Sequence, residues 1–255
     1  MTRDDAETAP RATADVAREI PLLARMPQRF RAAAATRPTG ARLEELNQTD
    51  AALDEQAQAE MREAQRQFRQ QAWTESIRRA SRYETASLDR LYPQQDPDGK
   101  VTRWLASGKR NLVLKGESSR GKTHAAYAIG NAASAAGLWT VGWRFSDLLR
   151  ELRPNGLDPD RSAAEDAWMH VTSCDILILD DFGGEAKNSA SEWVPAQAVD
   201  ILDARARNER RTVITTNLSG REIRARYGDP VTNRIMERAE AALIDGDVIE
   251  PPDPF

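Results

Sequence analysis

The sequence predicts an α/β fold of three αβα layers, with a mainly parallel sheet between two layers of helices and an α-helical region before it. The main observation is that short apolar runs alternate with helical stretches beyond residue 81, which is typical of a parallel sheet buried on both faces. A second observation is a glycine-containing loop between the first of these runs and the helix after it. The expected strands cover 111–114, 139–143, 176–179 and 212–215, and the expected helices cover 124–136, 146–153 and 193–207.

Composition limits what else the chain can contain. With 255 residues it is long enough for one substantial core but not for two full-size domains. Its single cysteine excludes a disulfide framework and a multi-cysteine zinc site, and no run approaches the ~18 apolar residues of a membrane helix. No signal peptide is recognisable, so we expect a cytoplasmic protein without a membrane partner. The net charge of −4 argues against binding of nucleic acid through a large basic surface.

The first 80 residues differ in composition from the rest. Residues 1–42 contain closely spaced prolines and are expected to form a flexible tail, or alternatively a docking segment that orders on a partner. Residues 43–80 contain neither proline nor glycine, and their apolar residues recur at steps of three, four or seven, which predicts a long helix. A helix that packs on its own domain and a helix that binds a partner are equally compatible with this pattern.

A phosphate-binding loop is predicted at residues 116–123, which match the pattern G-x-x-x-x-G-K-[ST] between an expected strand and an expected helix. In such a loop, glycines let successive backbone N–H groups point at phosphates, and the N-terminal end of the following helix adds a positive potential. Lys122 is expected to reach the β- and γ-phosphates of a nucleotide, and the hydroxyl of Thr123 to bind Mg²⁺. The predicted ATP-binding residues are Gly116, Glu117, Ser118, Ser119, Arg120, Gly121, Lys122 and Thr123.

Two adjacent carboxylates follow the apolar run 176–179. Asp180 and Asp181 are therefore expected at the carboxyl edge of the sheet, where ligands bind in open α/β folds. We expect Asp180 to hold the Mg²⁺ shell and Asp181 to orient and polarise the attacking water. An apolar run that ends in two aspartates is weak evidence alone, but together with the phosphate loop it predicts a catalytic ATP site.

Two further polar residues are candidates for catalysis. Asn217 follows the expected strand 212–215, and its amide is predicted to bind the attacking water or the γ-phosphate, although alone it reads as a turn or cap residue. Arg234 is expected near the start of a helix that follows the last strand. Considered alone, Arg234 is a surface arginine or one half of an ion pair.

In their order and spacing, these motifs resemble those of DnaC-type replicative helicase loaders, in a clade of AAA+ P-loop ATPases that also contains the IstB transposition helper. The resemblance covers about residues 82–240. It rests on the segments 82–88, 104–105, 111–114, 121–124, 144–149, 179–183 and 215–217, with Arg205 and Arg234 at fixed spacing on either side of the last. The sequence departs from the family at 246–252, where the family commonly carries a sensor arginine and this chain has none.

The resemblance implies a function in DNA replication: ATP-dependent loading of a hexameric replicative helicase onto single-stranded DNA. ATP and Mg²⁺ are the implied cofactors, and hydrolysis is expected to be slow and stimulated by assembly. In the family, the arginine matching Arg234 enters the ATP site of a neighbouring subunit, which implies self-association through that site. Two alternatives stay open: an IstB-like transposition helper, and an adaptor that uses ATP as a switch without hydrolysing it.

The resemblance also implies a division of the chain. Residues 81–244 are expected to form the AAA+ domain, residues 43–80 to dock the helicase, and residues 245–255 to form a flexible acidic tail. Because every motif lies beyond residue 81, we expect deletion of residues 1–78 to leave a folded ATP-binding domain.

Contact with single-stranded DNA is the last implication of the resemblance. The matching stretch contains arginines and one aromatic residue that can serve as a stacking surface. Alternatively, the arginines form a solvated face and the aromatic residue belongs to the core. The candidate DNA-binding residues are Phe145, Arg150, Arg153 and Arg161.

Overall fold

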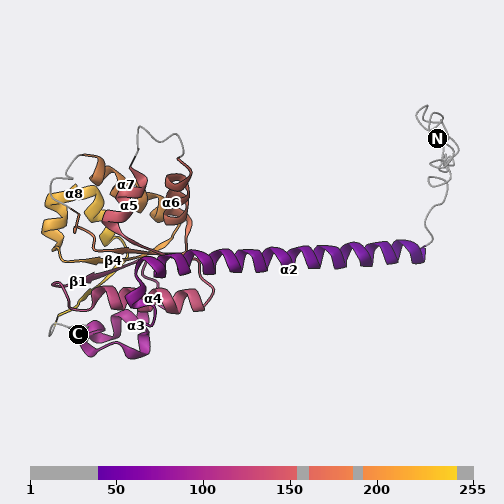
Figure 1. Ribbon diagram of the computed structural model, residues 1–255, viewed down its shortest axis with the longest axis horizontal. Coiled ribbons are helices and arrows are strands. Elements are labelled where there is room, and N and C mark those ends of the chain that lie inside the picture. The colour runs from indigo at the N-terminus through magenta and orange to yellow at the C-terminus, as the bar shows by residue number, and fades with distance from the viewer. Residues whose placement is uncertain (1–39, 154–160, 186–191, 246–255) are drawn as a thin grey trace, which may run out of the picture. The chain divides into compact units, whose positions relative to one another are not determined.

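The computed structural model describes residues 40–153, 161–185 and 192–245, and it confirms the expected α/β fold. Five parallel strands form one sheet in the order β2-β3-β4-β1-β5. Figure 1 shows this sheet, with β1 and β4 labelled, among the helices. The strands are β1 (Asn111–Lys115), β2 (Thr140–Arg144), β3 (Ile176–Asp180), β4 (Arg211–Thr216) and β5 (Ala239–Leu243). The α-helices are α2 (Gly40–Arg79), α3 (Lys100–Trp104), α4 (Lys122–Ala135), α5 (Phe145–Leu152), α6 (Ser162–Ser173), α7 (Trp193–Arg207) and α8 (Gly220–Met236).

The four expected strands form where successive apolar side chains can be buried on opposite faces of the sheet. In β3, Ile176 and Ile178 pack into one hydrophobic core, while Leu177 and Leu179 pack into the other. The fifth strand, β5, was not predicted, because its sequence Ala-Glu-Ala-Ala-Leu consists of good helix formers. Its hydrogen bonds to β1 override that local preference.

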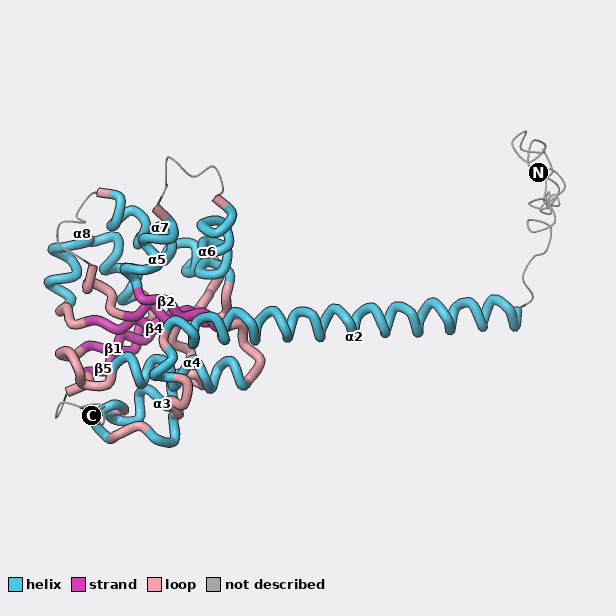
Figure 2. Tube along the Cα trace, in the orientation of Figure 1, coloured by secondary structure: helices cyan, strands magenta, loops and turns pink. Residues whose placement is uncertain are grey.

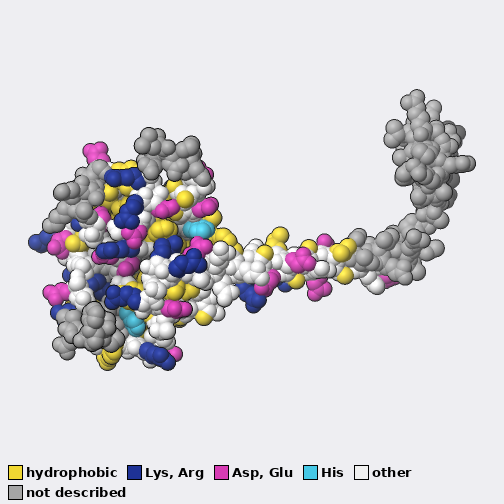
Figure 3. All heavy atoms as spheres, in the orientation of Figure 1, with side chains coloured by type: hydrophobic (Ala, Val, Ile, Leu, Met, Phe, Trp, Pro, Cys, Tyr) yellow, Lys and Arg dark blue, Asp and Glu magenta, His cyan; other side chains and the backbone are white. Residues whose placement is uncertain are grey.

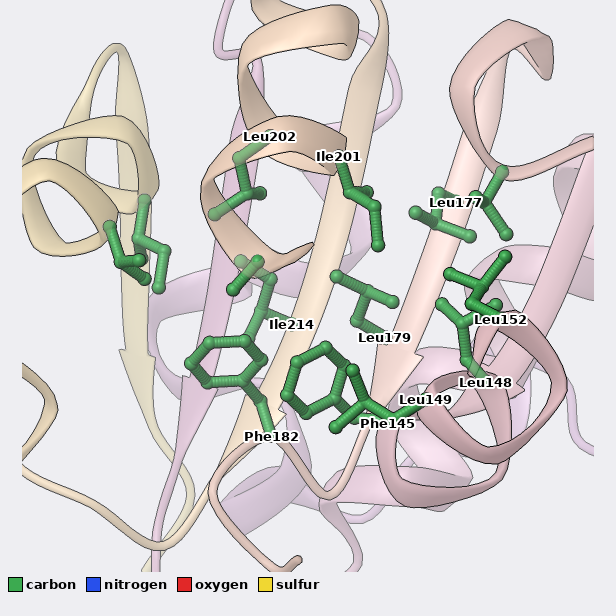
Figure 4. Close-up of a cluster of buried hydrophobic side chains, with 14 of the residues drawn as sticks. Phe145, Leu148, Leu149, Leu152, Leu177, Leu179, Phe182, Ile201, Leu202 and Ile214 are labelled. Atoms are coloured by element: carbon green, nitrogen blue, oxygen red, sulfur yellow. The ribbon is translucent and has the colours of Figure 1, made fainter. Parts of the chain in front are cut away.

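Helices cover both faces of the sheet (Figure 2). The helices α3 and α4 lie on one face, and α5, α6, α7 and α8 lie on the other. Figure 4 shows the core between the sheet and the helices α5–α8, in which Phe145 and Phe182 lie beside Leu179 and Ile214. None of the helices in the described ranges is both long and apolar enough to cross a membrane.

The chain divides into one unit of residues 1–60 and another of residues 61–255, so the division falls inside α2. In the second unit, Ala72 and Trp73 are buried. The hydroxyl of Ser76 accepts a hydrogen bond from the backbone N–H of Gly142 at 2.9 Å, and Arg79 donates to the carbonyl of Gly142 at 3.2 Å. Because Gly142 lies on the edge strand β2, the end of α2 satisfies backbone groups that would otherwise be open.

This packing moves the start of the folded unit from the expected residue 81 to Met61. Trp73 attaches this part of α2 to the folded unit, since its indole N–H donates to the side-chain oxygen of Asn131 on α4 at 3.0 Å. The ring also lies so close to Gly130 that a Cβ atom there would be 2.2 Å from it. That deletion of residues 1–78 leaves a folded ATP-binding domain stays a prediction, but the deletion would remove these packing contacts.

Truncations should separate the two parts of α2. Removing residues 1–60 is expected to leave the thermal unfolding of the second unit unchanged, whereas removing residues 1–78 should lower its stability, because loss of a buried tryptophan alone costs about 3–5 kcal/mol. Trp73→Ala in the full chain should reproduce most of that loss, and Gln71→Ala, at an exposed position of the same turn, should not. Equal unfolding midpoints for the two truncations would contradict this account.

The helix α8 contains a break at Gly228, which adopts φ 83° and ψ 174° and is followed by Pro230. Glycine tolerates this conformation, and proline at 230 cannot continue a hydrogen-bonded helix. The break divides α8 into two helical segments, and Arg234 lies near the start of the second, as expected. One expectation about Arg234 is wrong: β5 follows it, so it does not come after the last strand.

Candidate functional site

Most of the residues predicted for the ATP site, though not Arg234, meet at the carboxyl edge of the sheet. The sheet order brings the ends of β1, β3 and β4 together, and the loop after β1 opens α4. A cavity of about 450 Å³ lies there. Of the residues predicted from sequence, those that line it are Ser118, Ser119, Lys122, Thr123, Asp180, Asp181 and Asn217. Parallel strands place such a crevice where open α/β sheets bind ligands.

The backbone of the phosphate loop depends on its two glycines. A Cβ atom on Gly116 would lie 2.0 Å from the backbone oxygen of Ile244, so no other residue fits beside the end of β5. Gly121 has a φ of 89° and forms the N-cap of α4. The loop therefore delivers the unpaired N–H groups of the first turn of α4 to the cavity, which favours a bound anion.

Lys122 is the cation of the loop, and its side chain is largely buried. Its ammonium group donates a hydrogen bond to the backbone oxygen of Glu117, 2.5 Å away, on the opposite side of the loop. Burial lowers the pKa of Lys122, and the carboxylates of Asp180 and Asp181 partly offset that effect. Glu117 and Arg120, which the motif leaves unspecified, form an ion pair at 3.0 Å across the loop.

The two predicted metal ligands converge on one point. The hydroxyl of Thr123 donates to Oδ1 of Asp180 at 2.8 Å, and the hydroxyl of Thr215 donates to the same oxygen at 2.7 Å. Burial raises the pKa of Asp180, while these two hydrogen bonds lower it. A hydroxyl and a carboxylate oxygen beside a phosphate loop fit Mg²⁺, which takes few protein ligands and keeps water and phosphate oxygens. Thr215 was not predicted, although its place at the end of β4 next to Asn217 was a usable signal.

Asp181 has a backbone conformation that is unusual for a residue with a side chain, with a φ of 55°. Its N–H donates to the hydroxyl of Thr215 at 2.8 Å. Its carboxylate accepts two hydrogen bonds from Arg144 at the end of β2, at 2.8 Å from Nη2 and 3.2 Å from Nε. Sequence reasoning missed Arg144, because only the pairing of β2 with β3 brings it beside the acidic residues.

Asn217 lies at the tip of β4 and is exposed. Its amide nitrogen donates to the hydroxyl of Ser118 in the phosphate loop at 3.4 Å. The amide is thus within reach of whatever the loop holds.

Comparison with known proteins identifies the family to which the chain belongs. Residues 29–247 match the family of IstB-like ATP binding proteins. The chain belongs to this family. One relative, the ATP-binding protein of insertion sequence IS232 from Bacillus thuringiensis subsp. berliner, is 30% identical over 132 residues, which are 51% of this chain and 50% of that protein. The replicative helicase loader DnaC of Buchnera aphidicola subsp. Acyrthosiphon pisum is 23% identical over 160 residues, 60% of this chain and 64% of that protein.

The fold of the family agrees with a solved relative. A crystal structure of the DnaC helicase loader matches with a TM-score of 0.54 and 26% identity, covering 64% of this chain and 99% of that chain. The IstB-like protein therefore has an AAA+ P-loop fold, as the motifs predicted. The chain spans between 50% and 64% of the length of the two relatives compared by sequence.

Arg234 of the IstB-like protein does not belong to the cluster around the cavity. It is exposed and forms ion pairs with Asp203 and, at 3.3 Å, with Glu237. The side chain of Asn111 donates to the backbone oxygen of Arg234 at 2.8 Å. Asn111 begins β1, whereas the phosphate loop follows the other end of that strand, about 13 Å away at ~3.3 Å per residue. Arg234 thus lies at the edge of the sheet opposite to the cavity.

The candidate DNA contacts receive one correction. Phe145 is completely buried and packs on Phe182, with ring centroids 4.6 Å apart, so its ring cannot stack on a base (Figure 4). Arg150 is exposed and pairs with Asp147 at 3.2 Å. Arg153 lies over the ring of Trp193, with 5.5 Å from its Cζ atom to the ring centroid, and Arg161 is exposed just before α6. On the face of residues 61–255 that Figure 3 shows, basic and acidic side chains are mixed.

Proposed function

We propose that this IstB-like protein is a Mg²⁺-dependent ATPase that self-associates when it binds ATP and delivers a replicative helicase to single-stranded DNA. One observation carries the proposal. Lys122, Thr123, Asp180 and Asp181 meet in one cavity, while Arg234 lies at the opposite edge of the sheet. Because Arg234 lies too far away to reach the cavity of its own subunit, it can contact ATP only in the cavity of a neighbouring subunit.

The proposed chemistry follows from the positions of the side chains. The loop N–H groups and Lys122 bind the phosphates, with Lys122 leaving the backbone oxygen of Glu117 to do so. Thr123 and Asp180 hold Mg²⁺, which neutralises phosphate charge when it is bound. Asp181 polarises the attacking water, and Arg144 fixes the direction of that carboxylate. Asn217 contacts the water or the γ-phosphate from the side of Ser118.

Self-association brings Arg234 of one subunit to the cavity of the next. In the proposed assembly, Arg234 exchanges its ion pair with Asp203 for the terminal phosphate of the next subunit. A guanidinium there stabilises the charge of the transition state and raises the rate by about 10³- to 10⁵-fold in related phosphoryl-transfer enzymes. Hydrolysis is therefore slow in the monomer and stimulated by assembly.

The proposed helicase-docking surface is the apolar face of α2. In the second unit, Met61 and Phe68 are exposed there by 64% and 42%. Their spacing of seven residues keeps them on one side of the helix. Single-stranded DNA is proposed to bind the exposed Arg150, Arg153 and Arg161 through its phosphates, without Phe145.

A second candidate function is the delivery of a transposase instead of a helicase. The observation that favours it is the similarity to the IS232 protein, 30% identical over 132 residues. The ATP site and its neighbour-supplied arginine serve both functions equally, so only the partner separates them.

Purified partners test the choice. The protein, loaded with a slowly hydrolysed ATP analogue, is mixed with the replicative helicase of its source and separately with a transposase from the same genome, and complexes are separated by size. We expect a complex with the helicase that Met61→Asp weakens at least tenfold and the adjacent exposed control Glu60→Ala does not. A complex formed only with the transposase would transfer the proposal to the second function.

A further inference from the structure

Three arginines that were not predicted as site residues line the same cavity: Arg79, Arg82 and Arg144. Two of them have fixed partners. Arg144 binds Asp181, and the guanidinium of Arg79 lies 3.8 Å from the ring centroid of Trp143 while it donates to the backbone of Gly142.

Arg82 differs from the other two. It is exposed, and its one recorded contact within the described residues is with the ring of Tyr83, 5.0 Å from its Cζ atom to the centroid. It is therefore the arginine of this cavity whose charge remains available to a ligand.

The segment that carries Arg82 is held against α4, the helix that begins at the phosphate loop. The ring of Tyr83 stacks on Tyr127 of α4, with centroids 5.3 Å apart and planes 22° apart. The side-chain amide of Asn131, also on α4, donates to the backbone oxygens of Tyr83, Glu84 and Ala86 at 3.3, 3.2 and 2.7 Å. These contacts fix the backbone of residue 82 relative to the loop, so only its side chain has to move to meet a ligand.

The lining of the cavity identifies which part of it Arg82 faces. Arg82 and Tyr83 line it together with Thr123 and Asp180, the two predicted metal ligands. A metal ion bridges the β- and γ-phosphates in such sites, so this is the part where the terminal phosphate lies.

We propose that Arg82 contacts the γ-phosphate of ATP within its own subunit, as a nucleotide-binding residue distinct from the arginine supplied by a neighbour. The proposal rests on the proposed function, because it assumes that the cavity binds ATP. Arg82 follows the end of α2 closely, at Arg79, so the helix proposed to dock the partner ends inside the nucleotide site. A contact between Arg82 and the γ-phosphate would therefore connect the bound nucleotide to the segment that directly follows α2.

The test compares nucleotides that differ only in the terminal phosphate. Affinities of the full chain for ADP and for a slowly hydrolysed ATP analogue are measured with Mg²⁺ by calorimetry. Arg82→Ala should weaken the ATP analogue by about 10-fold or more, the value of one charge-assisted hydrogen bond, and leave ADP within about twofold. Arg82→Lys, which keeps the charge, should recover part of the loss.

The control variant is Arg78→Ala, which removes an exposed arginine from the last turn of α2 that does not line the cavity. It should bind both nucleotides like the parent. Equal losses of ADP and ATP analogue in Arg82→Ala, or no loss of either, would overturn the assignment of Arg82 while leaving the ATP site intact. A parent protein that binds neither nucleotide would instead contradict the proposed function itself.

Discussion

Alanine in place of Lys122 is expected to abolish binding of ATP. The ammonium group points into the phosphate loop, where it contacts the backbone oxygen of Glu117. Without it, the phosphates of ATP would enter a cavity that still contains the carboxylates of Asp180 and Asp181. Loss of attraction and unrelieved repulsion act together, so the dissociation constant should rise by at least about 100-fold.

The fold should survive this change. Burial lowers the pKa of Lys122, which means that its charge is held in the folded protein at a cost. The unfolding midpoint of Lys122→Ala should therefore equal or exceed that of the parent. Titration of a fluorescent ATP analogue against Lys122→Ala, the exposed control Lys109→Ala and the parent measures the effect. Parent-like affinity in Lys122→Ala would show that the loop does not cradle phosphates.

Arg234→Ala is expected to bind ATP normally and to lose turnover by about 10³-fold or more once the protein is assembled. Binding is spared because Arg234 lies at the sheet edge opposite to its own cavity, where Asn111 holds its backbone oxygen. Turnover is lost because a cation aimed at developing charge lowers the barrier more than it tightens the ground state. Phosphate release under assembling conditions, together with ATP affinity in the monomer, separates the two effects.

The control for Arg234 comes from its own ion pair. Asp203→Asn removes a carboxylate partner of Arg234 but leaves the guanidinium in place. It should keep turnover at or above the parent level. If Arg234→Ala and Asp203→Asn have the same small effect, the arginine has only the role of an exposed ion pair.

The sequence predicted the parts of the site that are contiguous along the chain. The phosphate loop and the acidic end of β3 depend on local patterns, a glycine spacing and an apolar run, that survive without knowledge of the fold. Residues that come together only through tertiary contacts were missed. Arg144 meets Asp181 because β2 pairs with β3, and Gly116 is confined because β5, a strand made of helix-forming residues, lies beside β1.

The burial of Phe145 was predictable from the sequence, although the sequence analysis gave it only as the alternative to stacking on DNA. Phe145, Leu148, Leu149 and Leu152 lie at positions i, i+3, i+4 and i+7, which line a single helix face, and all four are buried in α5. By contrast, nothing in the local pattern of α2 distinguished its last turns from the rest. Tertiary contacts, those of Trp73 with α4 and of Ser76 and Arg79 with Gly142, make the end of that helix part of the folded unit.

Mixing two inactive variants tests the central claim most directly, namely that each ATP site is completed by Arg234 of a neighbour. Arg234→Ala subunits keep a sound cavity, and Lys122→Ala subunits keep a sound arginine. With random assembly at equal amounts, roughly a quarter of the interfaces join a sound cavity to a sound arginine, so about that fraction of parental turnover should return. Turnover no higher than that of either variant alone, at every ratio and in mixtures shown to co-assemble, would contradict the claim.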